Sequence, residues 1–251
     1  MRYFIYLSFK GTEYCGWQIQ PNSPSVQECV EKSLSMFLRS SVSVVGAGRT
    51  DTGVHARMMV AHFDLQEQQD CEWMKKKMNG ILPADISVIK IVPVRADAHA
   101  RFDAVSRTYR YYLVTEKDPF EMDFAWRVYE KPDFELMNRA AKRLLDVTDF
   151  TSFSKLHTEA KTNNCRVIQA EWSSLSENRW FFTIKADRFL RNMVRAIVGT
   201  LMEVGRHSIS LDEFSQIIEQ KNRCAAGDSA PAQGLFLEEI EYPESLFNVI
   251  D

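Results

Sequence analysis

The sequence predicts an α+β fold made of two successive halves. Short segments alternate apolar and polar residues as strands do, and longer segments repeat apolar residues at helical spacing. The order strand, helix, strand, strand, helix, strand occurs twice, which is typical of ferredoxin-like halves. We expect a boundary near Ala104, with domains at 1–104 and 105–251. Two such sheets side by side would leave a cleft, where functional sites often lie.

The elements of the first half follow from local patterns. Residues Arg2 to Phe9 alternate as a half-buried strand does. Pro24-Ser25 is a suitable start for a helix whose face repeats every four residues, at Val26, Val30, Leu34 and Leu38. The remaining expected elements are strands at 42–45, 55–63 and 86–94 and a short helix at 71–78.

The second half repeats this order with one addition. The segment "TYRYYLVT" predicts a strand at 108–115, and Asp133 can cap a helix that reaches about residue 145. Further expected elements are paired strands at 166–172 and 179–185, a helix at 189–204, an additional helix at 211–221 and a closing strand at 234–242.

Composition excludes several classes of protein. The chain has 251 residues, of which 45% are hydrophobic, and no apolar run approaches the length of about 18 residues that spans a membrane. Its five cysteines are odd in number and show no Cys-x-x-Cys spacing, so neither a disulfide framework nor a zinc site is indicated. The histidines show no metal-binding spacing either, and the first residues do not resemble a leader peptide. We expect a cytoplasmic protein with no bound metal.

Charge is distributed unevenly along the chain. The net charge is −3, which by itself argues against a nucleic-acid partner. Residues 185–206, however, carry five basic and two acidic side chains. An acidic protein can therefore still offer a positive face for phosphate groups, although solvated helix faces often have the same composition.

The stretch "VVGAGRTDTGVHA", residues 44–56, allows three interpretations. A dinucleotide-binding turn would need glycine where Asp51 stands, and a phosphate-binding loop would need a lysine after Gly53. An aspartic-protease pair would need a second aspartate and a raised pKa, which the neighbouring Arg49 opposes. The third interpretation places the Asp51 carboxylate at the tip of a glycine-rich turn, as a nucleophile or base oriented by Arg49. Aspartate is a common turn former in glycine-rich loops, and from this turn alone the structural role is favoured.

Three other segments allow both a functional and a structural interpretation. On one helix, Arg188, Arg191 and Arg195 would fall within about 60° of one another, either to bind anions or to border an amphipathic helix. In "SRTYRYYL", residues 106–113, Tyr109 shares a strand face with an arginine, which suits base stacking as well as core packing. The loop "GTEYCGWQIQ", residues 11–20, could contact RNA bases or pack over the first sheet. No activating partner is evident near Cys15 or Cys165.

Several motifs together resemble the TruA-type tRNA pseudouridine synthases. They are "GTEYCGWQIQ", "GAGRTDTGVHA", "NGILPADI", "ARFDAVSRTYRYYL", "DFTSFS", "RFLRNMVRAIVGTLMEVG" and "APAQGLFLEEIEYP". They occur in the family's order from about residue 2 to residue 243. Any one of them alone would be weak, but the set is highly specific. Thr52 stands where many family members have alanine, a small change beside the reacting carboxylate.

The resemblance implies roles for four residues. Asp51 would be the nucleophile, and the Tyr109 ring would stack against the target uracil. Arg195 would pair with the catalytic carboxylate, and Arg49 would enter the space left by a flipped nucleotide.

The resemblance also implies a fold, a partner and a reaction. The fold would be two ferredoxin-like halves sharing an extended, mainly antiparallel sheet with helices on one face and a central basic cleft, in a homodimer that binds tRNA. Uridines 38, 39 and 40 of the anticodon stem-loop would become pseudouridine, without a cofactor because no oxidation state changes.

Two alternatives from other functional classes remain at this point. One is a non-catalytic RNA-binding protein with RRM-like halves, although the aromatic signature of that module is absent. The other is an N-glycoside hydrolase, which commonly needs a second carboxylate about 5–10 Å from the first. Asp64 is the nearest further acid along the sequence.

Overall fold

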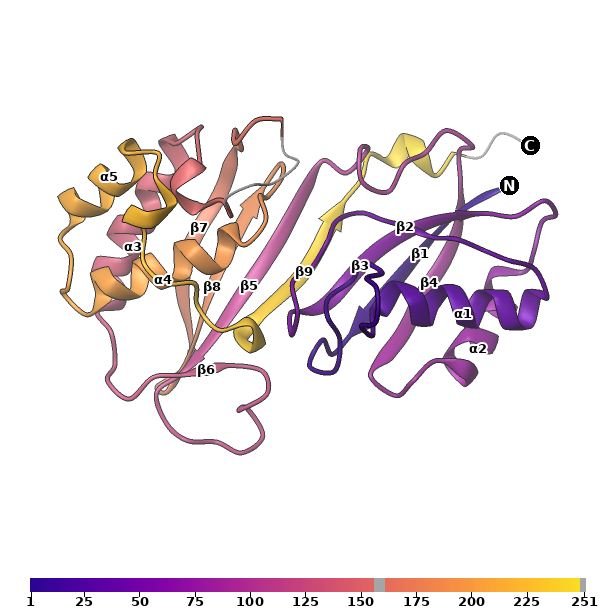
Figure 1. Cartoon of the computed structure of the whole chain (residues 1–251), viewed down its shortest axis with the longest axis horizontal. Helices are drawn as coiled ribbons and strands as arrows, with labels where there is room; N and C mark the ends of the chain where they lie inside the picture. The colour runs from indigo at the N-terminus through magenta and orange to yellow at the C-terminus, as the bar shows by residue number, and fades with distance from the viewer. Residues whose placement is uncertain (156–160, 249–251) are drawn as a thin grey trace. The chain divides into compact units, whose positions relative to one another are not determined.

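The computed structural model describes residues 1–155 and 161–248. It confirms the α+β class, with five α-helices in the described residues and strands that form a large, mostly antiparallel sheet (Figure 1). The chain divides into two compact units, 1–105 with 237–251, and 106–236. The domain ranges 1–104 and 105–251 stay a prediction. No helix in the described residues is long and apolar enough to cross a membrane.

The first unit is built around a central strand. Strand β1 (Arg2–Phe9) pairs antiparallel with β3 (His55–Asp64) on one side and with β4 (Ile86–Val94) on the other. Residues Tyr3 to Leu7 of β1 are all buried, and since successive side chains point to opposite faces, the strand is covered on both faces. The chain order strand, helix, strand, strand, helix, strand agrees with the order expected for this half.

Two capped helices complete the first unit. Helix α1 (Val26–Leu38) begins at Ser25, whose hydroxyl accepts a hydrogen bond from the Glu28 amide, as expected from Pro24-Ser25. Helix α2 (Cys71–Ile81) begins after Asp70, whose carboxylate accepts from two amides of the first turn. Helix α2 packs on β4 and against α1.

The strand expected at 42–45 is shorter and lies later in the chain. Only β2 (Val45–Gly46) forms, paired with β3. The preceding backbone is bonded to side chains of α1 instead. The Val44 amide donates to the Glu31 carboxylate at 2.9 Å, and the Val44 carbonyl accepts from the Gln27 amide group at 3.1 Å. Side-chain partners have replaced the strand ladder at this point.

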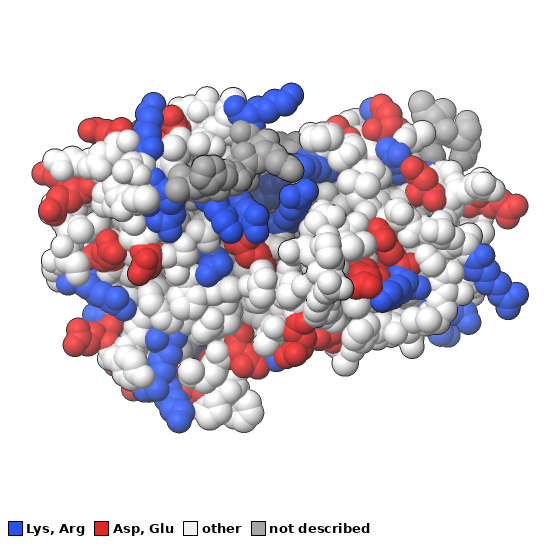
Figure 2. All heavy atoms as spheres, viewed as in Figure 1, with Lys and Arg blue, Asp and Glu red and all other residues white. Residues whose placement is uncertain are grey.

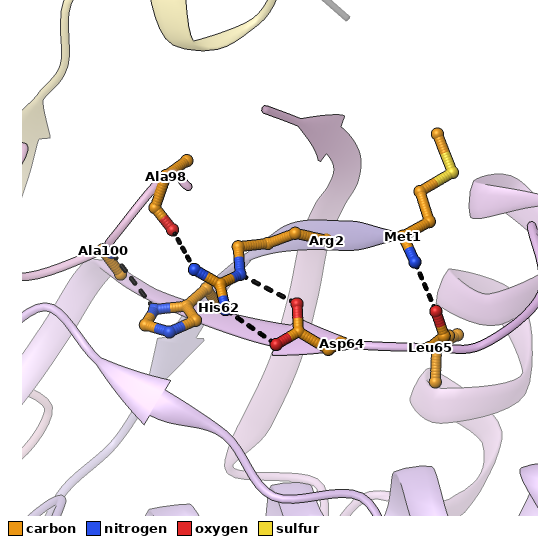
Figure 3. Close-up of polar contacts among 7 residues, drawn as sticks. All are labelled: Met1, Arg2, His62, Asp64, Leu65, Ala98 and Ala100. Carbon is orange, nitrogen blue, oxygen red and sulfur yellow. Dashed lines mark hydrogen bonds and ion pairs between the residues drawn. The ribbon is translucent and has the colours of Figure 1, made fainter. Parts of the chain in front are cut away.

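Polar contacts tie the ends of β1 and β3 to the segment that follows β4 (Figure 3). The Arg2 guanidinium makes two hydrogen bonds to the Asp64 carboxylate, at 2.7 and 2.8 Å, and a third to the Ala98 carbonyl at 2.9 Å. The Ala100 amide donates to Nδ1 of His62 at 3.2 Å. Residues 98–100 are thereby fixed to the end of the sheet.

In its described residues, 106–155 and 161–236, the second unit has its own strands and three α-helices. Strand β5 (Ser106–Val114) pairs antiparallel with β8 (Arg179–Ala186), which pairs in turn with β7 (Val167–Ser176). The short β6 (Trp126–Arg127) runs parallel to β5. The helices are α3 (Phe134–Arg143), α4 (Met193–Gly205) and α5 (Leu211–Glu219).

The helices of the second unit pack together and on its outer strand. Helix α3 contacts β7, α4 and α5. Asp133 caps α3 by accepting a hydrogen bond from the Leu136 amide at 2.9 Å, as the sequence predicts. Eleven of the thirteen residues of α4 are buried, which makes it the core helix of this unit. Strand β9 (Leu235–Glu241) crosses the boundary, and residues from Leu237 onward group with the first unit.

Candidate active site

Asp51 is the first residue of a tight turn, residues 51–54, in the loop between β2 and β3. The Asp51 carbonyl accepts a hydrogen bond from the Val54 amide at 3.1 Å, which closes the turn. Gly53 has a φ of 77°, in the left-handed region that a side chain rarely tolerates. Its amide donates to the Tyr14 carbonyl at 3.3 Å. Asp51 is half-buried, so the turn presents a carboxylate without enclosing it.

The residues around Asp51 alternate in exposure. Arg49 and Thr52 are exposed and Thr50 is buried, so the turn is anchored at Thr50. His55, at the start of β3, has no exposed surface, and its Nδ1 accepts a hydrogen bond from the Gly11 amide at 2.9 Å. Arg49 and Asp51 therefore belong to one short loop with a fixed base.

The loop "GTEYCGWQIQ" packs in the way expected of a structural segment. The exposed fractions of Tyr14 and Trp17 are 6% and 1%, which leaves neither ring available for stacking on a base. The side-chain amide of Gln18 donates to Gln27 at 2.8 Å, and that of Gln20 donates to the Cys15 carbonyl at 3.0 Å. The structure favours packing over the first sheet.

Tyr109 lies on β5 in the second unit, paired with Ile184 of β8. Its ring meets that of Phe189 edge to face, with centroids 5.0 Å apart, and the residue is half-buried. Tyr111, two residues along the same strand face, is completely buried, and its hydroxyl donates to the Pro231 carbonyl at 2.8 Å. The strand thus carries one structural tyrosine and one that is partly accessible.

Arg195 lies in the first turn of α4. Its Nε donates to the Ala230 carbonyl at 2.7 Å, and the Ala230 amide donates back to the Arg195 carbonyl at 3.0 Å. Ala230 is next to Pro231, which accepts from Tyr111, so Arg195 and the tyrosine face of β5 converge on one segment. The sequence reasoning missed this segment, although it begins the motif "APAQGLFLEEIEYP".

The expectation that three arginines line one helix is wrong for two of them. Helix α4 begins at Met193, so Arg188 and Arg191 precede it and only Arg195 is helical. A hydrogen bond to a residue far along the chain holds the segment before Met193 out of the helix. Asn192 is left-handed, with a φ of 65°, and its side-chain amide donates to the Ser229 hydroxyl at 2.6 Å. This long-range contact outweighs the apolar spacing that predicted a helix from residue 189.

Basic residues nevertheless gather around Asp187. Its carboxylate accepts from the backbone amides of Arg166 and Arg188, at 2.8 and 2.7 Å. We call this group the basic turn; its members are Arg107, which donates to the Asp187 carbonyl, Arg166, Arg188, Arg191, and Lys155, whose amide donates to the Arg191 carbonyl. Figure 2 shows Lys and Arg side chains gathered on the visible face of the second unit, in the area where β8 and α4 lie.

Two alternative chemistries lose support from the structure. Asp64 is at the far end of β3 from the Asp51 turn, nine residues beyond His55, which corresponds to about 30 Å at about 3.3 Å per residue. It cannot be the second carboxylate of a hydrolase centred on Asp51.

Burial raises the pKa of the Cys165 thiol to about 12, which disfavours a thiolate nucleophile. Within 1–155 and 161–248, no three His, Cys, Asp or Glu side chains are placed to hold a metal.

The structure thus places the four candidate residues in two pairs. Arg49 and Asp51 share one loop of the first unit, and Tyr109 and Arg195 are positioned within the second unit. Arg49 is exposed, and Asp51, Tyr109 and Arg195 are half-buried, so all four side chains keep some accessible surface.

Comparison with known proteins identifies the family. The tRNA pseudouridine synthase family matches residues 5–103 and 140–243, ranges that contain Arg49, Asp51 and Arg195 and leave Tyr109 in the stretch between them. The chain is 58% identical to tRNA pseudouridine synthase A of Bacteroides fragilis, with 98% of each chain covered. It is 57% identical to the protein of that name from Bacteroides thetaiotaomicron, covering 98% of this chain and 93% of the relative. It is 55% identical to that of Parabacteroides distasonis, covering 100% and 99%. On these matches, the chain belongs to the tRNA pseudouridine synthase family.

Proposed function

We propose that the protein isomerises uridine to pseudouridine in tRNA, at positions 38, 39 and 40 of the anticodon stem-loop, with Asp51 as nucleophile. Family membership supports the reaction and the tRNA substrate. The observation that carries the residue assignment is the Asp51 turn, because its left-handed Gly53 and its buried neighbours Thr50 and His55 hold one half-buried carboxylate in a fixed place. The sequence motifs support the anticodon positions.

The reaction needs few chemical groups. The bond between N1 of uracil and C1′ of ribose breaks, the base turns, and C5 bonds to C1′. The C5 proton leaves and N1 gains a proton, so substrate and product are isomers and no redox cofactor is consumed. A carboxylate can attack C1′, add to uracil C6, or take the C2′ proton as the base leaves C1′, so that the ribose becomes a glycal. Each route requires an oxygen nucleophile or base where Asp51 stands.

The other three residues have roles that fit their placement. The base must leave its stack at a cost of a few kcal/mol, and stacking on the half-buried Tyr109 ring would return about 1–3 kcal/mol. Arg49, exposed in the same loop as Asp51, would occupy the space left in the RNA. Arg195 would balance negative charge on the catalytic carboxylate, with its Nε already oriented by the Ala230 carbonyl.

The basic turn supports an RNA partner. Four arginines and a lysine belong to this turn with one aspartate, an excess of positive charge in a chain of net charge −3. Phosphate contacts of this kind supply much of the affinity of RNA-binding proteins without reading sequence.

The proposal includes the finer fold and the assembly. The order of strands and helices in each unit supports two ferredoxin-like halves with a central basic cleft. The motif resemblance supports a cytoplasmic homodimer that uses neither metal nor cofactor. Light scattering of the purified protein tests the homodimer, and a mass equal to one chain of 29.0 kDa would contradict it.

Asp51→Asn tests the nucleophile. It keeps the size of the side chain but removes the negative oxygen, so we expect pseudouridine formation in a tRNA transcript to be abolished while tRNA binding and unfolding stay near native. Asp64→Asn is the matched control, because that carboxylate lies at the other end of β3, and it should keep activity. Nucleoside mass analysis that locates the product reads both variants.

Three results would contradict the assignment. Retained activity in Asp51→Asn would show that Asp51 is not the nucleophile. Release of free uracil by the native protein would indicate a hydrolase. Tight tRNA binding by the native protein with unchanged nucleoside composition would indicate a non-catalytic RNA-binding protein.

A further inference from the structure

The loop Gly11–Trp17, which we call the clamp loop, contacts the Asp51 turn along its whole length. The Gly11 amide donates to His55, and the Tyr14 carbonyl accepts from the Gly53 amide. A side chain at Gly11 would overlap the Val54 carbonyl oxygen, and one at Gly46 would overlap the Trp17 indole. The two loops are therefore in van der Waals contact from the end of β2 to the start of β3.

Gly16 makes the closest approach to the catalytic turn. It has a φ of 89°, which favours glycine, and a Cβ at this position would overlap the Thr50 carbonyl oxygen and lie 3.2 Å from the carbonyl carbon of Asp51. Because Gly16 has no side chain, the backbone of Thr50 and Asp51 can lie in direct contact with the clamp loop. Even a methyl group would displace Thr50 or Asp51.

Tyr14 connects this contact to a second motif. Its buried hydroxyl donates to the Asp85 carboxylate at 2.7 Å, and the Asp85 carbonyl accepts from the Lys10 amide at 2.9 Å. Asp85 belongs to "NGILPADI", a motif for which the proposed reaction has no direct use. Burial, followed by the bond to Asp85, raises the pKa of Tyr14, so the hydroxyl keeps its proton and stays a donor.

We propose that the chain of contacts from Asp85 through Tyr14 to Gly53, together with the bare backbone of Gly16, positions the Asp51 carboxylate for attack. The proposal rests on the proposed function. Tyr14, Gly16 and Asp85 are positioning residues and need not touch the RNA. Small displacements of a reacting group from outside the chemistry can lower a rate by up to about 100-fold, so the contribution is measurable.

Gly16→Ala gives the largest displacement. The single-turnover rate of pseudouridine formation falls about 10- to 100-fold while the Kd for tRNA stays within about twofold, because the change moves Asp51 without altering charge. Gly80→Ala, on α2 with open space around the glycine, is the matched control and keeps the native rate. A native rate in correctly folded Gly16→Ala would overturn the proposal.

A double-mutant cycle tests the side-chain link even if Gly16→Ala fails to fold. Tyr14→Phe and Asp85→Ala each lower the single-turnover rate about fivefold, and the double variant is no slower than either, because they break one contact. Asp85→Asn keeps an acceptor oxygen and restores most of the rate. Tyr3→Phe, which removes the hydroxyl that accepts from the Gln69 amide, is the control for a lost buried hydroxyl and keeps the native rate. Additive losses, or an equal loss in Tyr3→Phe, would overturn the link.

Hydrogen exchange separates this proposal from the proposed function. In Tyr14→Phe and Gly16→Ala, the amides of Gly53 and Val54 exchange faster, while those of β1 and β3 keep native protection. This readout does not depend on the reaction. Native exchange at Gly53 in both variants overturns the positioning role, whereas absence of pseudouridine with the native chain overturns the proposed function alone.

Discussion

Stability should fall sharply between about pH 7 and about pH 5 because of His62. Its exposed fraction is 5%, and its Nδ1 accepts the Ala100 amide, a contact that only the unprotonated nitrogen can make (Figure 3). Burial, followed by the charges of Arg2 and His99, lowers its pKa from 6.5 to about 4, against weaker opposing effects of Asp64 and Asp103. The folded protein therefore disfavours protonation of this side chain.

The sign and size follow from linkage. Between the folded pKa of about 4 and the unfolded value of 6.5, the unfolded chain binds the proton and the folded chain does not. The contribution of His62 is complete above the unfolded pKa and is lost as the pH falls toward the folded pKa. From about pH 7 to about pH 5, the free energy of unfolding should drop by about 2 kcal/mol from this group alone.

Urea unfolding at both pH values, with native protein and His62→Gln, measures the effect. The variant does not titrate there, so its loss of stability over the interval should be smaller than the native loss by about 2 kcal/mol. Its stability at about pH 7 is lower because packing and the Ala100 contact change. Equal pH dependence in native protein and His62→Gln would refute the reasoning.

Two further predictions concern RNA binding and can be checked on one tRNA transcript. Tyr109→Phe keeps the stacking ring, so its Kd should stay within about twofold of native, and a loss above about tenfold would contradict a role based on stacking. Replacing Arg166 and Arg188 of the basic turn together by alanine should lower the slope of log Kd against log salt by about 1.5, because each phosphate contact contributes about 0.7–0.9. Filter binding over a salt series measures the slope, and an unchanged slope would show that Arg166 and Arg188 make no phosphate contacts.

Local patterns were sufficient for the α+β class and for most helices and strands. The strand at the start of the chain and the caps Ser25 and Asp133 have purely local causes, because alternation and capping involve residues only a few positions apart. The predictions were wrong where a hydrogen bond to a residue distant in sequence determined the backbone conformation. Val44 bonds to Glu31 and Gln27 rather than to a strand, and Asn192 bonds to Ser229, which delays the start of α4.

For the candidate site, sequence and structure contribute differently. The sequence by itself determined the family, through the ordered motifs, and the identity of Asp51, Tyr109, Arg49 and Arg195 as candidates. It could not decide between stacking and packing for the loop "GTEYCGWQIQ", because the exposure of a ring depends on segments far along the chain. Only the tertiary structure showed Tyr14 and Trp17 buried and the clamp loop in contact with the Asp51 turn. Such contacts join residues about 40 positions apart, and a local sequence pattern carries no information about which distant backbone fills the space beside a glycine.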